Sequence, residues 1–130
     1  MANADTGTAA TESGLDSPVI ERAAERAGVD ERALCDALVV LHADLIGRHG
    51  RFERAFDYVT VDGTRAYRVA DEAWDDLLEE FEFEDAVADA AMLAHTEQAK
   101  LLFAKSVRGD DNFDADESGV VIGIDTAEQF

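Results

Sequence analysis

A single turn constrains the fold of this chain more than any other feature of its sequence. The dipeptide Asp62-Gly63 supplies the positive φ angles of a type I′ turn, which joins two adjacent antiparallel strands. On either side, residues 56–61 and 64–69 are rich in aromatic and β-branched side chains, as strands are. The resulting register pairs Phe56 with Val69, Asp57 with Arg68, Tyr58 with Tyr67, and Val59 with Ala66. The aromatic pairs predict a core face of the hairpin, and the other pairs predict a face toward solvent.

Apolar residues at helical spacing cover most of the remaining chain. The pattern predicts four helices, over residues 17–27, 30–49, 71–81 and 84–107. Gly28 and Gly50 follow the first two segments directly, where a helix commonly ends. The last segment begins with a face rich in alanine, so another helix can approach its backbone closely.

The length of 130 residues and the apolar content of 47% suit one domain with a core of its own. We expect residues 1–15 to be a disordered leader and residues 16–130 to form the domain, with an acidic loop at 108–118. Residues 119–124 are a candidate third strand beside the hairpin. The prediction is therefore an α+β fold, with about four helices and one β-hairpin in a single compact domain.

Acidic residues are spread along the whole chain. It holds 30 Asp and Glu residues against 11 Lys and Arg residues, a formal net charge of −19. Such charge destabilises a compact state at low ionic strength, whereas at about 1 M salt the Debye length falls to roughly 3 Å. An acidic tail made for a basic partner would instead form one block of like charge. The composition is typical of a halophilic cytoplasmic protein.

The cysteine content and the apolar runs agree with that location. Cys35 is the one cysteine, so no internal disulfide can form, and its place within a predicted helix favours a small buried side chain over a catalytic thiol. The first residues have neither the basic start nor the apolar centre of a secretion signal. No apolar run is long enough to span a membrane, so no membrane partner is expected.

Residues 22–38 resemble the helix-turn-helix of bacterial repressors, with small residues at Ala24 and in the turn at Gly28. The hairpin that follows would then be a wing, so the resemblance implies a winged-helix transcriptional regulator. A recognition helix needs cationic or amide side chains in its first turns to contact phosphates and bases. The corresponding turns carry Asp30 and Asp36. Nucleic acid is therefore an alternative partner that the charges disfavour.

Residues 114–125 resemble the calcium loop of an EF-hand, a motif that surrounds a hard cation with oxygen ligands. Its first, third, fifth, sixth and twelfth places are held by Asp114, Asp116, Ser118, Gly119 and Asp125. The twelfth place has Asp where the longer Glu is usual, and residues 126–130 leave little room for an exit helix. A divalent-metal-binding protein is thus a second alternative.

The three histidines offer another arrangement for a metal. His42 and His49 lie on one predicted helix and His95 on another, so antiparallel packing of the two helices would bring them together. Three histidines suit a transition metal with one open position. However, no Glu-x-x-His or His-x-x-x-His spacing is present, and histidines on a helix flank are usually polar surface residues.

Other catalytic signatures are missing from the sequence. There is no phosphate-binding glycine loop, no nucleophile elbow and no Cys-x-x-Cys. We therefore assign no catalytic, cofactor-binding or metal-binding residues and no cofactor, and favour a protein that is not an enzyme.

Three stretches, residues 38–46, 57–69 and 123–130, together resemble small acidic proteins of unknown function from haloarchaea. The resemblance covers nearly the whole predicted domain and implies no activity. We expect a non-catalytic cytoplasmic module that binds another protein or itself. The alanine-rich start of the predicted helix 84–107 motivates this hypothesis, because one small core does not use all of that face.

Overall fold

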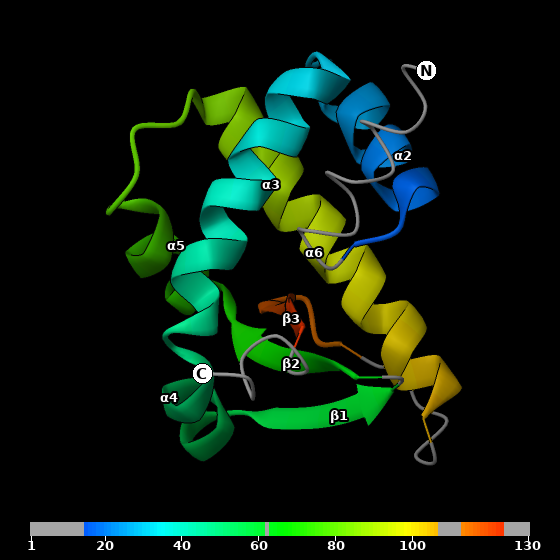
Figure 1. The fold of residues 1–130 in the computed structure, drawn as a ribbon, viewed down its shortest axis with the longest axis vertical. Coiled ribbons are helices and arrows are strands. Elements are labelled where there is room, and N and C mark those ends of the chain that lie inside the picture. The colour runs from blue at the N-terminus through cyan, green and yellow to red at the C-terminus, as the bar shows by residue number, and fades with distance from the viewer. Residues whose placement is uncertain (1–14, 62, 107–112, 124–130) are drawn as a thin grey trace.

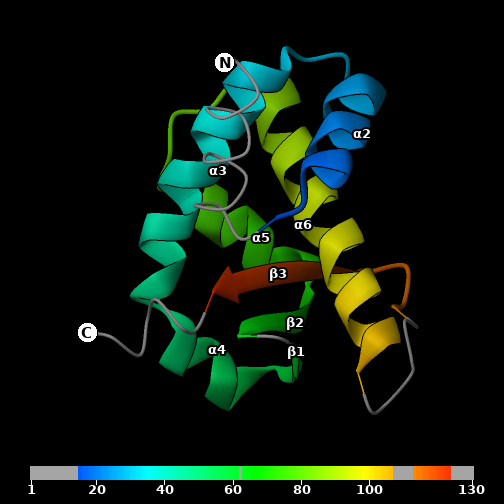
Figure 2. The ribbon, with the colours of Figure 1, turned by 45° about the vertical axis from the view of Figure 1, so that its right-hand side comes forward.

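Five helices and a three-stranded antiparallel sheet make up the described part of the chain, residues 15–61, 63–106 and 113–123 of a computed structural model. The helices are α2 (Ser17–Ala27), α3 (Glu31–Ile46), α4 (His49–Ala55), α5 (Asp71–Leu78) and α6 (Asp85–Lys105), and the strands are β1 (Asp57–Val61), β2 (Thr64–Ala70) and β3 (Glu117–Gly123). Figures 1 and 2 show α2, α3 and α6 packed together above the sheet. The predicted α+β class is confirmed, with one helix more than expected.

The hairpin has the predicted register over its strands, which pair Asp57 with Arg68, Tyr58 with Tyr67 and Val59 with Ala66. Phe56 follows the end of α4 and lies outside β1, so its predicted pairing with Val69 is absent. The candidate third strand is confirmed, since β3 pairs with the other side of β2. It begins at Glu117, so the end of the predicted loop 108–118 is strand; residues 107–112 and 124 lie outside the described residues.

Both faces of the sheet are covered, and the predicted solvent face of the hairpin is wrong. Val59 is 6% exposed and Ala66 is fully buried. They pack with Val121 against the later turns of α6, around Ala99 and Phe103. The opposite face, which includes Tyr67 and Ile122, joins the main core. Pairing within a hairpin is set by local sequence, whereas covering of a face depends on a helix far along the chain.

The predicted helix 30–49 is interrupted. It ends at Ile46, and after a turn at Gly47 a separate helix, α4, begins at His49. Gly50 lies inside α4 and does not end a helix. The break lets α4 direct Phe52 into the core, where its ring lies 5.5 Å from that of Tyr67. The turn at Gly47 therefore brings a second helical face onto the sheet.

The other helices lie close to their predicted positions. α2 ends at Ala27, and Gly28 follows with φ of 70°, the left-handed conformation that glycine favours. α5 ends at Leu78, before the predicted limit of Phe81. Most of the predicted leader 1–15 lies outside the described residues, but Leu15 is buried in the core.

Candidate functional site

The outer edge of β3 is covered by helix side chains. β3 lies at one side of the sheet, where an unpaired strand would offer its backbone to other chains. Three alternate N–H groups instead donate to side chains at 3.0 Å: Gly119 to Thr96 Oγ1, Val121 to His95 Nδ1, and Gly123 to His42 Nε2. The Trp74 indole N–H also donates to the Gly119 carbonyl at 2.9 Å. Helices α3, α5 and α6 thus supply hydrogen-bond partners along this edge.

Two of the three histidines therefore act as hydrogen-bond acceptors for the sheet. An imidazole nitrogen that accepts an N–H cannot carry a proton or bind a metal at the same time. His95 is fully buried, and burial, helped by the nearby His42, lowers its pKa to about 3. Its Nε2 atom is buried with no hydrogen-bond partner in the described residues. His95 is thus a neutral core side chain.

The structure does not gather the histidines into a ligand set. His49 begins α4, and its backbone carbonyl accepts the Tyr67 hydroxyl at 3.0 Å. In residues 15–61, 63–106 and 113–123, no group of three or more His, Cys, Asp or Glu side chains could hold a metal ion. The predicted approach of His42, His49 and His95 therefore yields no metal centre there.

The segment that resembles an EF-hand loop forms a turn and a strand. Glu117 and Ser118 are already part of β3, and the Ser118 hydroxyl donates to the Asp71 carboxylate. Gly119 faces α6 so closely that an added Cβ would lie 2.3 Å from the Cβ of Ala99. Asp125 lies outside the described residues. The ligand positions at 118 and 119 are thus used for packing of β3.

Residues 22–38 do form two helices joined at Gly28, as the resemblance to repressors implied. α3, however, exposes Arg32, Asp36 and Val40, a face without concentrated positive charge. The supposed wing is also the centre and one side of a covered three-stranded sheet. Neither element has the charge or the freedom that a winged helix uses on DNA.

Cys35 is a buried free thiol, as expected. Burial raises its pKa, and the nearby carboxylates of Glu31, Asp36 and Asp30 raise it further. The thiolate that a nucleophile or a metal ligand requires is therefore disfavoured at this position.

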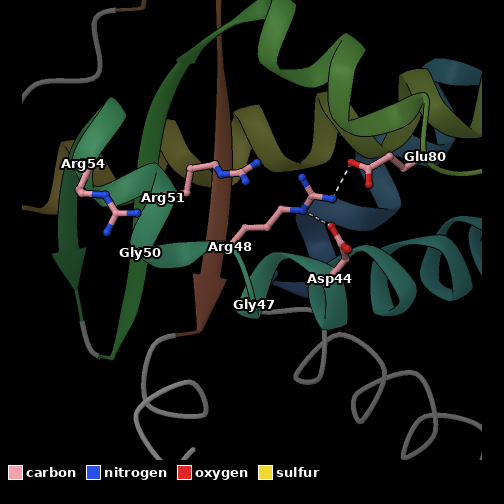
Figure 3. A pocket seen from close by; sticks show the side chains of 7 residues that line it. All are labelled: Asp44, Gly47, Arg48, Gly50, Arg51, Arg54 and Glu80. Carbon is pink, nitrogen blue, oxygen red and sulfur yellow. Dashed lines mark hydrogen bonds and ion pairs between the residues drawn. The ribbon is translucent and has the colours of Figure 1, made fainter.

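A surface groove lies between α4 and α5, and we call it the α4–α5 groove. It consists of two hollows that share Arg48, Arg51 and Glu80. The larger, of about 690 Å³, is polar and is also lined by Asp44, Gly47, Gly50 and Arg54 (Figure 3). The smaller, of about 310 Å³, has an apolar floor, with exposed surface from Ala55, Phe56 and Ala73 above the buried Phe52 and Leu77. An elongated ligand with charged and apolar parts would fit this combination.

The arginines of the groove differ in their contacts. Arg48 donates to Asp44 at 2.6 Å and to Glu80 at 2.5 Å, so it links the end of α3 to the end of α5. The Asp44 hydrogen bond is the main cause that raises the pKa of Arg48. Arg51 and Arg54 are exposed, and within the described residues their side chains have no hydrogen bond or ion pair (Figure 3). Two guanidinium groups are thus available to an anion, and Arg51 also borders the apolar floor.

The basic residues of the sequence carry a signal for this groove. Residues 48–54 place three arginines within seven positions of a chain with only 11 basic residues. The prediction ends a helix at His49, before Gly50, and considers His49 only in a possible histidine site, so it divides the segment. The three arginines share a face because they lie on or beside α4, a separate helix that the sequence pattern did not predict.

The chain belongs to the family described as Domain of unknown function (DUF8048), whose model matches residues 13–124. No curated protein and no solved structure matches the chain significantly. In the described residues, no helix is both long and apolar enough to cross a membrane.

Proposed function

We propose that this domain is a non-catalytic interaction module, and that its α4–α5 groove binds an acidic segment of a protein partner that also carries apolar side chains. The observation that carries the proposal is the pair Arg51 and Arg54, whose side chains are unpaired within the described residues. Arg51 also borders the apolar hollow, where Ala55, Phe56 and Ala73 retain exposed surface. The chain has a net charge of −19, so an acidic segment can meet cationic side chains in near contact only at a local basic site.

The chemistry of arginine suits such a partner. A guanidinium group binds a carboxylate through two parallel hydrogen bonds, and arginine is frequent among the side chains that dominate binding energy at interfaces. Within the chain, Arg48 already binds two carboxylates through one hydrogen bond each, Asp44 at 2.6 Å and Glu80 at 2.5 Å. A partner carboxylate would bind Arg51 or Arg54 in the same way.

The proposed cellular setting makes an apolar contribution necessary. We place the protein in the cytoplasm of a salt-accumulating halophile, in keeping with its acidic composition. At about 1 M salt only charges in near contact attract, since the Debye length is roughly 3 Å. Apolar burial is not weakened in this way, so the exposed apolar surface of Phe56 and Ala55 would supply affinity and the arginines would supply selectivity.

Affinity selection from a displayed library of random short peptides, in molar KCl, tests the proposal. We expect enrichment of sequences that combine Asp or Glu with Leu or Phe. The double variant Arg51→Ala/Arg54→Ala should bind the enriched peptide about tenfold more weakly or worse, a loss of roughly 1.4 kcal/mol. The control Arg22→Ala/Arg32→Ala removes two exposed arginines of α2 and α3 and should bind like the wild type.

Two results would overturn the proposal. The first is enrichment of basic or uncharged peptides, which the arginines would not attract. The second is an affinity that the double variant keeps unchanged, because the bound peptide would then lie elsewhere on the molecule.

A further inference from the structure

The connection between α5 and α6 has the composition that the α4–α5 groove should bind. Residues 79–85 read Glu-Glu-Phe-Glu-Phe-Glu-Asp, so five of the seven side chains are carboxylates and two are aromatic. The rings of Phe81 and Phe83 stack at 5.1 Å with an angle of 2° between their planes, and both remain partly exposed. We call this segment the acidic-aromatic loop.

The charges of the loop and of the groove complement each other. Glu80, at the start of the loop, already binds Arg48 of its own groove. Glu82 and Glu84 are exposed, and within the described part of the chain neither side chain forms a hydrogen bond or ion pair. Two unpaired carboxylates thus lie on the loop, and two unpaired arginines, Arg51 and Arg54, lie in the groove.

The two surfaces lie on opposite flanks of the same short helix. One flank of α5 carries Ala73, Asp76 and Leu77, which line the groove. The other flank carries Asp75 and Leu78, which line a hollow of about 580 Å³ together with Phe81 and Phe83 of the loop. Both surfaces nevertheless meet at the end of α5, because Glu80 belongs to the loop and also lines the groove. A twofold axis beside that shared end, perpendicular to α5, would place each loop against the groove of a second copy. Such an arrangement closes on itself, as most homodimers do.

We infer that this protein forms a symmetric homodimer, in which the acidic-aromatic loop of each copy occupies the α4–α5 groove of the other. The inference rests on the proposed function of the groove and identifies its occupant as a second copy of the chain. Glu82 and Glu84 contact Arg51 and Arg54 of the partner, and Phe81 or Phe83 lies over the apolar floor.

A charge exchange tests the inference, with mass measured by sedimentation equilibrium in molar KCl. The wild type should be a dimer. Arg51→Glu/Arg54→Glu and Glu82→Arg/Glu84→Arg should each be monomers, because like charges then face each other. Combining all four substitutions should restore the dimer, since the pairs are re-formed with reversed sign. Arg22→Glu/Arg32→Glu, which changes charge by the same amount elsewhere, should stay dimeric.

Circular dichroism of each variant separates loss of the dimer from loss of the fold. A monomeric wild type, or a fourfold variant that stays monomeric while folded, would overturn the inference. Peptide selection distinguishes this failure from failure of the proposed function. If the wild type is monomeric and its groove still binds acidic peptides through Arg51 and Arg54, the occupant is a different protein. If neither dimer nor peptide depends on these arginines, both proposals fall.

Discussion

Helices supply polar side chains both to the β3 edge and to the α4–α5 groove. Those at the edge form hydrogen bonds to the backbone, whereas two arginines of the groove are unpaired within the described residues. At the β3 edge, Thr96, His95 and His42 each accept a backbone N–H and are largely removed from solvent. In the groove, Arg51 and Arg54 face solvent without a partner in the described residues. Side chains that complete the backbone hydrogen bonds of a sheet stabilise the fold, whereas unpaired charges beside an apolar floor remain available for binding.

The largest effect should come from Gly119→Ala at the β3 edge. The new Cβ would lie 2.3 Å from the Cβ of Ala99 and 3.1 Å from the backbone oxygen of His95, so the strand must separate from α6. We expect the free energy of unfolding to fall by about 3 kcal/mol, measured by guanidinium denaturation. Gly47→Ala is the control, because Gly47 has φ of −72° and its nearest atom lies at 3.5 Å. Equal losses for both variants would contradict close packing at Gly119.

The next largest effect should be on the pH dependence of stability, through His95. His95 has a pKa of about 3 in the folded protein against about 6.5 when unfolded, so between these values only the unfolded state takes up the proton. The contribution of neutral His95 to the free energy of unfolding is therefore fully present above pH 6.5. It decreases as the pH falls, by about 2 kcal/mol at pH 5. His95→Asn retains an acceptor for the Val121 N–H and should remove this contribution.

Denaturation of both proteins at pH 7 and pH 5 measures the difference. The carboxylates are the same in wild type and variant, so their titration cancels in the comparison. An identical pH dependence in the two proteins would show that His95 is not a neutral acceptor.

A smaller loss should follow removal of one acceptor from the edge. Thr96→Val takes away the oxygen to which the Gly119 N–H donates, and keeps a similar shape. An unsatisfied backbone N–H in a partly buried position should cost about 1 kcal/mol. Thr96→Ser keeps the hydroxyl and should lose less in the same denaturation experiment. If serine and valine behave alike, the hydrogen bond contributes nothing.

The smallest effect on stability should be in the groove. Arg51→Ala/Arg54→Ala removes no described contact, so the free energy of unfolding should change by no more than about 0.5 kcal/mol. Arg48→Ala breaks the ion pairs to Asp44 and Glu80 and should cost more, up to about 1 kcal/mol. If thermal melting shows a larger loss for the double variant than for Arg48→Ala, the two arginines are structural.

Local features of the sequence predicted the parts of the fold that depend on neighbouring residues. Asp62-Gly63 determines the register of the hairpin because the turn type fixes which residues face each other. The leucine spacing located α3, and Gly28 located the end of α2. These features act over a few residues, so no knowledge of the tertiary structure was required.

The parts that were missed depend on contacts between distant segments. α4 has only seven residues, with Gly50 inside it, and its position is stabilised by packing of Phe52 on Tyr67. His42 and His95 accept hydrogen bonds from residues 81 and 26 positions away. Neither the role of these histidines nor the common face of the arginines can be inferred from spacing within one helix.

The ribosome synthesises β3 after all of the helices and strands that it contacts. β3 follows every other described element, and it brings the carbonyl and N–H groups that Trp74, His95 and His42 bind. While β3 is still within the exit tunnel, the helices can pack but these three side chains lack their partners, and β2 has one open side. The sheet can therefore be completed only after β3 has left the tunnel, and until then β2 offers an unpaired edge to neighbouring chains.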